Sequence, residues 1–374
     1  MIMKNFQNIE LSGLGMGNMR LPLIPGKGDG DIDLERACAI IDKAMSAGVN
    51  YYDTAYVYHS GKSESFLGDA LVSRYPRESF YLATKFFIAA NPDYKAVFAE
   101  QLEKLKTYYV DFYLIHSVGD NSAKEYINGG SVKYFEEQKA LGKVKYLGFS
   151  AHCSTKTLKE FAEYRKWDFA QLQINYYDWK YGNAGNAKEQ YELLRDMGIP
   201  VVVMEPVRGG RLAELSPEAN ELLKNRHPDW SIASWAFRWL KGLDNVMMIL
   251  SGMSDMGQLE DNLNTFADDA YLTEEEERLL FTACDVFRNK LVIPCTACRY
   301  CTDSCPSQIN IPEFLRVYNH IKTDGDWASW EFEHIKSEGK PADCVSCGVC
   351  TEHCPQSIKI PELMGEISEK FGKQ

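Results

Sequence analysis

Eight of the eleven cysteines in this sequence stand in two short runs in its C-terminal part. In each run three cysteines are separated by two residues, and a fourth follows after three more residues, immediately before a proline. The first run is Cys295, Cys298, Cys301 and Cys305, and the second is Cys344, Cys347, Cys350 and Cys354. Such spacing lets one loop wrap around an iron–sulfur cubane and present three thiolates to three of its iron atoms.

The fourth cysteine of such a run is turned away and commonly binds the other cluster. The sequence therefore predicts two [4Fe–4S] clusters with exchanged fourth ligands. One ligand set is Cys295, Cys298, Cys301 and Cys354, and the other is Cys344, Cys347, Cys350 and Cys305. Zinc sites and disulfides are the alternatives. Structural zinc usually needs two ligand pairs with a longer spacer, and disulfides are rare in an intracellular chain, so clusters are the favoured interpretation.

Four other reactive side chains lie at or just after the ends of apolar runs. Asp53 follows NYY and Tyr58 lies in the loop after it, Lys85 ends FYLATK, and His116 ends VDFYLIH. If these runs are parallel strands of one barrel, their carboxyl ends meet at a single mouth. We therefore expect the four side chains to converge there.

These residue types suit the reduction of a carbonyl group, which needs a hydride on carbon and a proton on oxygen. A tyrosine phenol has a reference pKa of ~10, and a nearby cation lowers that pKa by stabilising the phenolate. Lys85 can supply the cation, Asp53 can orient Lys85, and His116 can hydrogen-bond the substrate oxygen. The hydride must come from a cofactor, because no side chain donates one. Each residue taken alone also has an ordinary structural interpretation.

The elements that position these residues alternate along the chain from residue 31 to about residue 270. The expected strands are residues 11–17, 50–55, 80–85, 110–116, 144–150, 169–176, 201–205 and 246–251. The expected helices between them include residues 34–47, 94–107, 131–141, 188–197 and 258–266, several of which end at a glycine. Strand–helix alternation implies a parallel sheet, and eight units imply a closed (β/α)8 TIM barrel of the α/β class.

The composition changes near Lys290, after one further expected helix over residues 273–285. The segment after Lys290 is rich in cysteine and proline, with helical patches at residues 312–322 and 327–337. The sequence therefore predicts two domains, a barrel over residues 1–288 and a small α+β or helical two-cluster domain over residues 289–374.

The motifs together resemble known families. The segment GVNYYDTAYVYHSGKSESFLGDAL, followed by ATK and YLIH, resembles the aldo-keto reductases in order and spacing over roughly residues 4–285. Residues 290–374 resemble a bacterial two-cluster ferredoxin, with a longer spacer between the two runs, so the whole chain resembles the ferredoxin-fused branch of the aldo-keto reductases. The resemblance implies an NAD(P)-dependent oxidoreductase with Tyr58 as general acid. It implies a catalytic tetrad of Asp53, Tyr58, Lys85 and His116.

The same resemblance implies a nicotinamide site along the barrel mouth. Ser150 matches the serine that contacts the carboxamide, but Ala151 replaces the usual asparagine, so His152 or a backbone group is expected to take its place. The other matched positions are Gln173, Glu205, Pro206, Gly209, Gly210, Gly252, Asp261 and Asn262. Glycines allow backbone amides to approach a pyrophosphate closely.

The segment SGMSDMGQLEDN bears on the choice of dinucleotide. Family members that prefer NADP usually place Lys or Arg here to pair with the 2′-phosphate, and this segment has neither. Asp255 and Glu260 lie close by instead, and acidic neighbours disfavour a phosphate dianion. The sequence therefore favours NAD(H), or a loosely held NADP(H).

The composition excludes several classes of partner. A net charge of −12 without a long basic run argues against nucleic acid or an anionic membrane as the main partner. The first residues lack the apolar core of a signal peptide, and no stretch approaches ~20 uncharged apolar residues. We therefore expect a cytoplasmic protein with neither nucleic acid nor membrane as a partner.

The leading hypothesis is reduction of a carbonyl, or oxidation of an alcohol, with the clusters linking the site to a ferredoxin- or flavodoxin-like electron partner. The clusters could instead only stabilise a C-terminal lid. Two further functions compete with it. One is an electron-transfer iron–sulfur protein whose barrel docks a partner or senses cofactor, and the other is cluster-fed one-electron reduction at the barrel mouth. The small-molecule substrate cannot be read from these residues.

Overall fold

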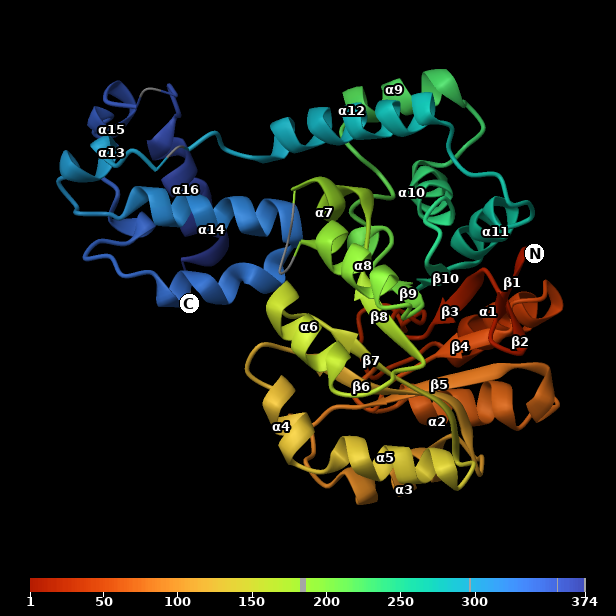
Figure 1. The fold of residues 1–374 in the computed structure, drawn as a ribbon. Coiled ribbons are helices and arrows are strands. Elements are labelled where there is room, and N and C mark those ends of the chain that lie inside the picture. The colour runs from red at the N-terminus through yellow and green to blue at the C-terminus, as the bar shows by residue number, and fades with distance from the viewer. Residues whose placement is uncertain (182–185, 296, 355, 373–374) are drawn as a thin grey trace. The chain divides into compact units, whose positions relative to one another are not determined.

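The computed structural model describes residues 1–181, 186–295, 297–354 and 356–372, and the chain forms two compact units (Figure 1). Unit 1 comprises Met1–Glu214 and Leu223–Phe281, and unit 2 comprises Leu215–Leu222 and Thr282–Gln374. The predicted domain boundary after residue 288 falls within helix α12 (Glu274–Leu291) and stays a prediction. Among the described residues, no helix is long and apolar enough to cross a bilayer.

Unit 1 is a closed barrel of eight parallel strands, which confirms the predicted (β/α)8 fold. Around the barrel the strands follow the order β10-β3-β4-β5-β6-β7-β8-β9. The strands are β3 (Leu14–Gly17), β4 (Tyr51–Asp53), β5 (Tyr81–Phe86), β6 (Val110–Val118), β7 (Val144–Ala151), β8 (Phe169–Gln173), β9 (Val201–Met204) and β10 (Val246–Ser251).

Helices follow the barrel strands along the chain. They are α1 (Leu34–Ser46), α2 (Ser63–Leu67), α3 (Tyr94–Lys104), α4 (Ala123–Asn128), α5 (Ser131–Ala140), α6 (Thr155–Glu163), α7 (Tyr176–Tyr181), α8 (Ala187–Asp196), α9 (Pro217–Arg226), α10 (Ile232–Lys241) and α11 (Met256–Thr265). Several begin after an Asp, Asn or Ser whose side chain accepts a hydrogen bond from a backbone N–H of the first turn. These N-caps are Asp33, Asp93, Ser154, Asn186, Ser231 and Asp255.

Two predicted strands have different limits in the structure. The run over residues 11–17 is divided at Gly13, so that β2 (Ile9–Ser12) pairs antiparallel with β1 (Met3–Phe6) and only β3 enters the barrel. The run over residues 169–176 ends at Gln173. There the Asn175 side chain accepts a hydrogen bond from the backbone N–H of Asp178 at 2.9 Å, which turns the chain into α7.

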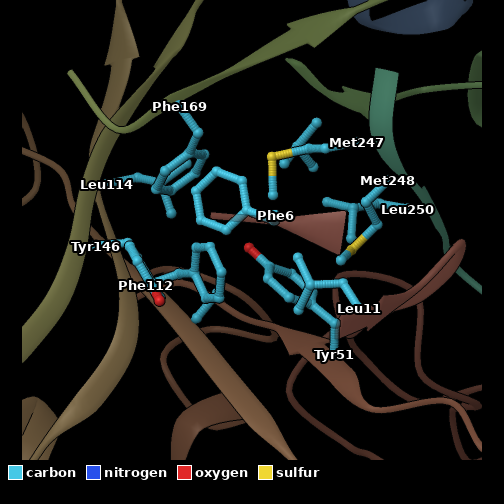
Figure 2. Close-up of a cluster of buried hydrophobic side chains, with 12 residues drawn as sticks. Phe6, Leu11, Tyr51, Phe112, Leu114, Tyr146, Phe169, Met247, Met248 and Leu250 are labelled. Carbon is cyan, nitrogen blue, oxygen red and sulfur yellow. The ribbon is translucent and has the colours of Figure 1, made fainter. Parts of the chain in front are cut away.

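The β1–β2 hairpin fills the amino-terminal end of the barrel (Figure 2). Its Phe6 ring lies 5.0 Å from the ring of Tyr146 and 5.7 Å from that of Phe112. Leu11 of β2 joins the same cluster of buried side chains. Because apolar rings block one end of the barrel, a site for polar ligands is left to the carboxyl ends of the strands.

Unit 2 is mostly helical and internally repeated. Its helices are α13 (Tyr300–Asp303), α14 (Ile311–Asp324), α15 (Val349–Glu352) and α16 (Ile360–Phe371), with 3-10 turns η4 (Asp326–His334) and η5 (Pro341–Asp343). A left-handed residue precedes α13 and α15, and α14 and α16 both begin with Ile-Pro-Glu. The repeat therefore extends beyond the cysteine runs. The patch predicted at residues 327–337 is the 3-10 turn η4.

Candidate active site and cluster cavity

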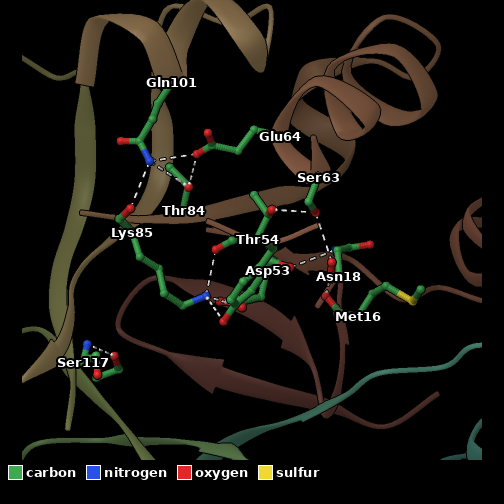
Figure 3. Close-up of polar contacts among 12 residues, drawn as sticks. Met16, Asn18, Asp53, Thr54, Ser63, Glu64, Thr84, Lys85, Gln101 and Ser117 are labelled. Atoms are coloured by element: carbon green, nitrogen blue, oxygen red, sulfur yellow. Dashed lines mark hydrogen bonds and ion pairs between the residues drawn. The ribbon is translucent and has the colours of Figure 1, made fainter. Parts of the chain in front are cut away.

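The ammonium group of Lys85, near the end of β5, is the centre of a buried polar site (Figure 3). It donates hydrogen bonds to Asp53 Oδ1, to the backbone oxygen of Thr54 at 2.7 Å, and to the Tyr58 hydroxyl at 3.3 Å. Since an ammonium has three N–H donors, these contacts use all of them and fix its position. Three of the four predicted tetrad residues are therefore in direct contact.

His116, the fourth, lies at an irregularity in β6. The register between β6 and β7 shifts between Ile115 and Val118, and Ser117 has a positive φ of 55°. Ser150 Oγ accepts a hydrogen bond from the Ser117 backbone N–H at 2.8 Å and so holds this bulge. Bulges of this kind re-aim side chains next to active sites. The His116 ring lies edge-on to Tyr58, with 5.9 Å between the ring centroids.

Burial dominates the electrostatics of the two rings. It lowers the pKa of His116 well below 6.5, and the charge of Lys85 adds to the effect, so the imidazole is neutral near pH 7. Burial also raises the pKa of Tyr58 above 10, although the charge of Lys85 opposes this rise. Lys85 thus acts on the pKa of Tyr58 in the expected direction, but the loss of hydration outweighs the cation.

Lys85 itself remains a cation. Burial alone would lower its pKa, but the charge of Asp53 and the hydrogen bonds to Asp53 and Tyr58 raise it overall. The buried ammonium and the Asp53 carboxylate therefore form an ion pair in which each stabilises the charge of the other.

A buried polar atom without a partner is a candidate for contact with a ligand. Within the described residues, Asp53 Oδ2, His116 Nδ1 and Gln171 Oε1 have no hydrogen-bond partner. Gln171 pairs in register with Ser150 across β7 and β8, and by strand alternation it shares the inward face with Phe169 of the barrel core. His116 Nδ1 and Gln171 Oε1 fit the carbonyl substrate and the carboxamide of a nicotinamide.

The sequence reasoning did not identify Gln171. It chose Gln173, two residues further along the same face of β8. The Gln173 amide donates to Asp178 Oδ2 at 2.8 Å, which engages it inside the protein. The two glutamines have the same strand alternation, so only the tertiary contacts tell them apart. A cofactor role for Gln173 stays a prediction.

The loop after β9 carries the matched positions Glu205, Pro206, Gly209 and Gly210, and its backbone is unusual. Glu205, Gly209 and Gly210 have positive φ angles of 54°, 65° and 96°. A cation that the sequence reasoning did not assign also reaches this loop. Arg20 Nη2 lies 3.4 Å from Glu205 Oε1, and a Cβ atom added to Gly209 would stand 3.0 Å from Arg20 Nη2. A Cβ atom on Gly252 would likewise stand 3.0 Å from Arg20 Cβ, so both glycines border this arginine.

Of the remaining predicted cofactor positions, two are hydrogen-bonded within the protein, one is buried and one is exposed. Asn262 donates to the side chain of the last residue of β10 at 3.0 Å, and Asp261 accepts from the N-cap serine of α10 at 2.5 Å. Pro206 is buried and His152 is exposed. Their roles in cofactor binding stay predictions.

In unit 2 a cavity is lined by cysteines from both runs. They are Cys295, Cys298, Cys301 and Cys354. Most of the other lining residues are apolar, among them Leu315, Ile358 and Ile360. The donor set fits a [4Fe–4S] cluster with the exchanged fourth ligand.

The other predicted ligand set is Cys344, Cys347, Cys350 and Cys305. Burial raises the pKa of the Cys350 thiol, and the closeness of Cys344 and Cys347 adds to that rise. Cys305 and Cys344 pack against the same core cluster as Cys350. The part of the chain that the structure describes contains no group of three His, Cys, Asp or Glu side chains suited to a single metal ion. Ligands of a cubane bind separate iron atoms and need not converge in that way.

Comparisons with known proteins agree with this two-part architecture. Residues 13–279 match the Aldo/keto reductase family, and residues 294–358 match a 4Fe-4S dicluster domain. The uncharacterized oxidoreductase YqkF of Bacillus subtilis is 27% identical over 73% of this chain and 92% of its own length. The NADH-specific methylglyoxal reductase of Escherichia coli is 25% identical over 68% of this chain and 90% of its own.

A solved structure with the same barrel is the aldo-keto reductase AKR11C1 from Bacillus halodurans in its holo form. It is 26% identical, with a TM-score of 0.61, over 76% of this chain and 96% of its own. The family match covers well over half of this chain, and the cluster domain follows it in sequence. The chain therefore belongs to the aldo/keto reductase family, as an oxidoreductase that carries a C-terminal 4Fe-4S dicluster domain.

Proposed function

We propose that this protein reduces a carbonyl group, or oxidises the corresponding alcohol, with a nicotinamide cofactor at the barrel mouth and Tyr58 as general acid. The observation that carries this proposal is the buried Lys85 ammonium, which donates to both Asp53 and Tyr58. A scaffold barrel would have no need to bury a lysine with a carboxylate and aim it at a phenol, because burying charges is costly.

In this mechanism Tyr58 donates its hydroxyl proton to the carbonyl oxygen as that oxygen gains negative charge. When bound, a nicotinamide would supply the hydride needed at the carbonyl carbon. Lys85 stabilises the phenolate left on Tyr58, and solvent later returns the proton. The neutral His116 has one ring N–H and one free nitrogen, so it can orient the carbonyl oxygen without competing as a cation.

Arg20, Gly209 and Gly210 are the residues that would hold the dinucleotide pyrophosphate, since they combine a cation with open backbone. The case for NAD(H) rested on the absence of a cation within the segment after β10. Arg36 of α1 donates to the Ser254 backbone oxygen of that segment at 3.5 Å, and Ser254 Oγ donates to the Arg20 backbone oxygen at 2.8 Å. The cation of Arg36 therefore reaches the segment from elsewhere in the chain, and we keep both NAD(H) and NADP(H) as candidates.

The substrate class we propose is a small carbonyl compound. A relative is named for methylglyoxal reduction with NADH, which supports aldehydes of that size as first choices. The Phe87 ring, 5.4 Å from the His116 ring, offers an apolar wall beside the reacting oxygen.

The test is anaerobic oxidation of NADH or NADPH by the full-length protein with a panel of aldehydes and ketones. Tyr58→Phe should lower the rate of carbonyl reduction by about 10²–10⁴-fold, because it removes the general acid. Tyr56→Phe is the matched control, since the Tyr56 hydroxyl donates to Glu100 at 2.9 Å, away from Lys85. Equal rates in the wild type and Tyr58→Phe would remove Tyr58 from the mechanism.

For the clusters we propose electron transfer to or from a ferredoxin- or flavodoxin-like protein. The cavity shared by Cys354 and the first cysteine run supports it, because exchanged ligands place two clusters close to one another. An anaerobic titration tests the proposal. Chemically reduced clusters should be reoxidised when substrate or oxidised nicotinamide is added. Clusters that stay reduced in both cases would leave them a structural role only.

A further inference from the structure

A second buried polar cluster lies beside the Lys85 site, and the proposed chemistry does not use it (Figure 3). The Glu64 cluster consists of Glu64, Thr84, Gln101 and Tyr113, all 0% exposed. Glu64 Oε1 accepts hydrogen bonds from Thr84 Oγ1 at 2.5 Å and from Gln101 Nε2 at 2.7 Å. The Tyr113 hydroxyl donates to Gln101 Oε1 at 2.6 Å.

This cluster holds the backbone of Lys85. The register of β4 against β5 ends at the pair Asp53 and Ala83, so Thr84 and Lys85 extend beyond it. At that point Gln101 Nε2 donates to the Lys85 backbone oxygen at 3.0 Å. The side chain of Thr84, which precedes Lys85, is tied to Glu64. Beyond the end of β4, side chains of α2 and α3 therefore hold this part of β5 by hydrogen bonds.

Ser63, the residue before Glu64, fixes another neighbour of the ammonium, Thr54. Ser63 Oγ accepts a hydrogen bond from Thr54 Oγ1 at 2.8 Å and donates to the Asn18 backbone oxygen at 3.0 Å. The backbone oxygen of Thr54 is itself an acceptor for Lys85 Nζ. Two adjacent residues of α2 therefore fix the surroundings of Lys85 from β4 and from β5.

Only one oxygen of Glu64 is engaged by these donors. Its second oxygen, Oε2, is buried and has no hydrogen-bond partner among the residues that the structure describes. Burial raises the pKa of Glu64, and the hydrogen bonds from Thr84 and Gln101 offset only part of that rise. The contacts of Glu64 therefore all lead through Oε1 to Thr84 and Gln101.

We propose that Glu64 is a positioning residue, which acts through Thr84 and Gln101 to fix Lys85 along β5 and so sets the distance from its ammonium to the Tyr58 hydroxyl. This inference rests on the proposed role of Tyr58 as general acid. The interaction of the ammonium with a forming phenolate weakens as their separation grows. A small shift of the Lys85 backbone therefore makes proton donation by Tyr58 harder.

The test compares Glu64→Met, which removes the acceptor at similar length, with Glu64→Gln, which keeps an acceptor oxygen. The direct readout is the Nζ–H signal of Lys85 in anaerobic, cluster-loaded full-length protein labelled with ¹⁵N-lysine. Its absence from Lys85→Met assigns it. We expect a protected signal in the wild type and in Glu64→Gln, and loss of that protection in Glu64→Met.

The kinetic readout separates positioning from binding. Glu64→Met should lower kcat for carbonyl reduction about tenfold and leave the substrate KM unchanged, because binding groups are not touched. Glu64→Gln should recover most of kcat. Thr84→Val, which removes one donor to Glu64 without changing its shape, should act in the same direction as Glu64→Met.

Asp111→Asn is the matched control for lost stability. Asp111 of β6 is a buried carboxylate that pairs with Arg77. It accepts a hydrogen bond at 3.0 Å from the backbone N–H of Leu82, which lies in β5, the strand of Lys85. This variant should lower the unfolding midpoint and leave the Lys85 signal protected. An unchanged Lys85 signal in folded Glu64→Met or in Thr84→Val would overturn the inference. The Lys85 signal is recorded without turnover. It therefore tests the positioning role of Glu64 even if the protein reduces none of the carbonyl compounds tested.

Discussion

At the scale of single residues, the site depends on how burial and one cation oppose each other. The Tyr58 hydroxyl lies 3.3 Å from Lys85 Nζ, yet burial keeps the pKa of Tyr58 above 10 in the ligand-free protein. Burial lowers the pKa of His116 well below 6.5. Both rings are therefore in their neutral forms across the physiological range, which is the state that an acid and a hydrogen-bonding partner of a carbonyl require.

The pH profile of carbonyl reduction follows from these directions. A general acid works while it holds its proton, so kcat/KM should stay level between about pH 7 and pH 9 and fall only as pH rises through the raised pKa of Tyr58. His116 gains its proton well below pH 6.5, so we expect no break near that pH. Rates measured from pH 5 to pH 10.5 check this, and a break at 6.5 that vanishes in His116→Asn would contradict it.

At the scale of elements, short segments hold the barrel closed at one end and shape it at the other. The β1–β2 hairpin inserts Phe6 among the rings at the amino-terminal end, while the bulge in β6 aims His116 at the carboxyl end. The hairpin lies outside the eightfold strand–helix repeat, whereas the bulge interrupts one strand of that repeat. Both adapt a general barrel to one site, which is why their effects can be tested separately.

Phe6→Ala should remove a buried ring that contacts Phe112 and Tyr146. We expect a loss of about 3–5 kcal/mol in the free energy of unfolding, since the cavity cannot refill easily inside a closed barrel. Urea denaturation measures it. Tyr108→Ala, at a side chain that is 92% exposed, is the control and should change stability by less than about 0.5 kcal/mol. Equal effects would mean that the hairpin does not pack in the barrel as described.

The start of α12 gives a prediction with a defined pH window. Glu276 accepts hydrogen bonds from Thr273 at the helix start and from His227, and although burial alone would raise its pKa, these bonds lower it to about 2. A lowered pKa in the folded state means that the ionised carboxylate stabilises the fold above its unfolded pKa of about 4.5.

Glu276→Gln should therefore lower the unfolding free energy at pH 7 by about 1–3 kcal/mol. The difference from the wild type should stay constant down to about pH 4.5 and shrink as pH falls from there toward 2, because the wild-type carboxylate then loses its charge. Urea midpoints at pH 7, 5, 4 and 3 measure this. A difference that does not change with pH would show that ionisation of Glu276 does not stabilise the fold.

At the scale of the whole molecule, an aldo/keto reductase barrel and a 4Fe-4S dicluster domain share one chain. Nicotinamide moves a hydride, whereas a cluster passes one electron at a time, so the two parts can exchange electrons only through an intermediate step or a partner. The cluster unit is repeated within itself, and the cavity lined by Cys354 and the first cysteine run follows from that repeat.

The exchanged ligand predicts a specific pattern of cluster loss. Cys354→Ser should remove the same cluster as Cys298→Ser, and Cys347→Ser should remove the other. The double variant of Cys354 and Cys298 should then lose no more iron than either single variant, while that of Cys354 and Cys347 loses both clusters. Iron and sulfide analysis with electron paramagnetic resonance of the reduced protein measures this. The opposite pairing would show that each run binds its own fourth ligand.

The sequence by itself determined the barrel and the identity of the cluster domain, and it predicted the tetrad candidates, because each is written in local patterns. Strand–helix alternation needs only the residues of each unit, and the cysteine spacing needs only one loop. Asp53, Lys85 and His116 could be predicted because parallel strands bring their carboxyl ends to one mouth whatever the details of packing. The predicted limits of two strands were wrong near Gly13 and Asn175. A hairpin forms at the first position and a local turn at the second, and neither continues the strand.

Only the tertiary structure decided the contacts between segments distant in sequence. Glu64 and Gln101 are ordinary polar residues in the sequence, and their link to Lys85 exists only after α2 and α3 pack on β5. Arg20 and Arg36 reach the loops after β9 and β10 from the other end of the chain. The balance between burial and the charge of Lys85 at Tyr58 likewise depends on how much water the fold excludes, which spacing along a sequence does not record.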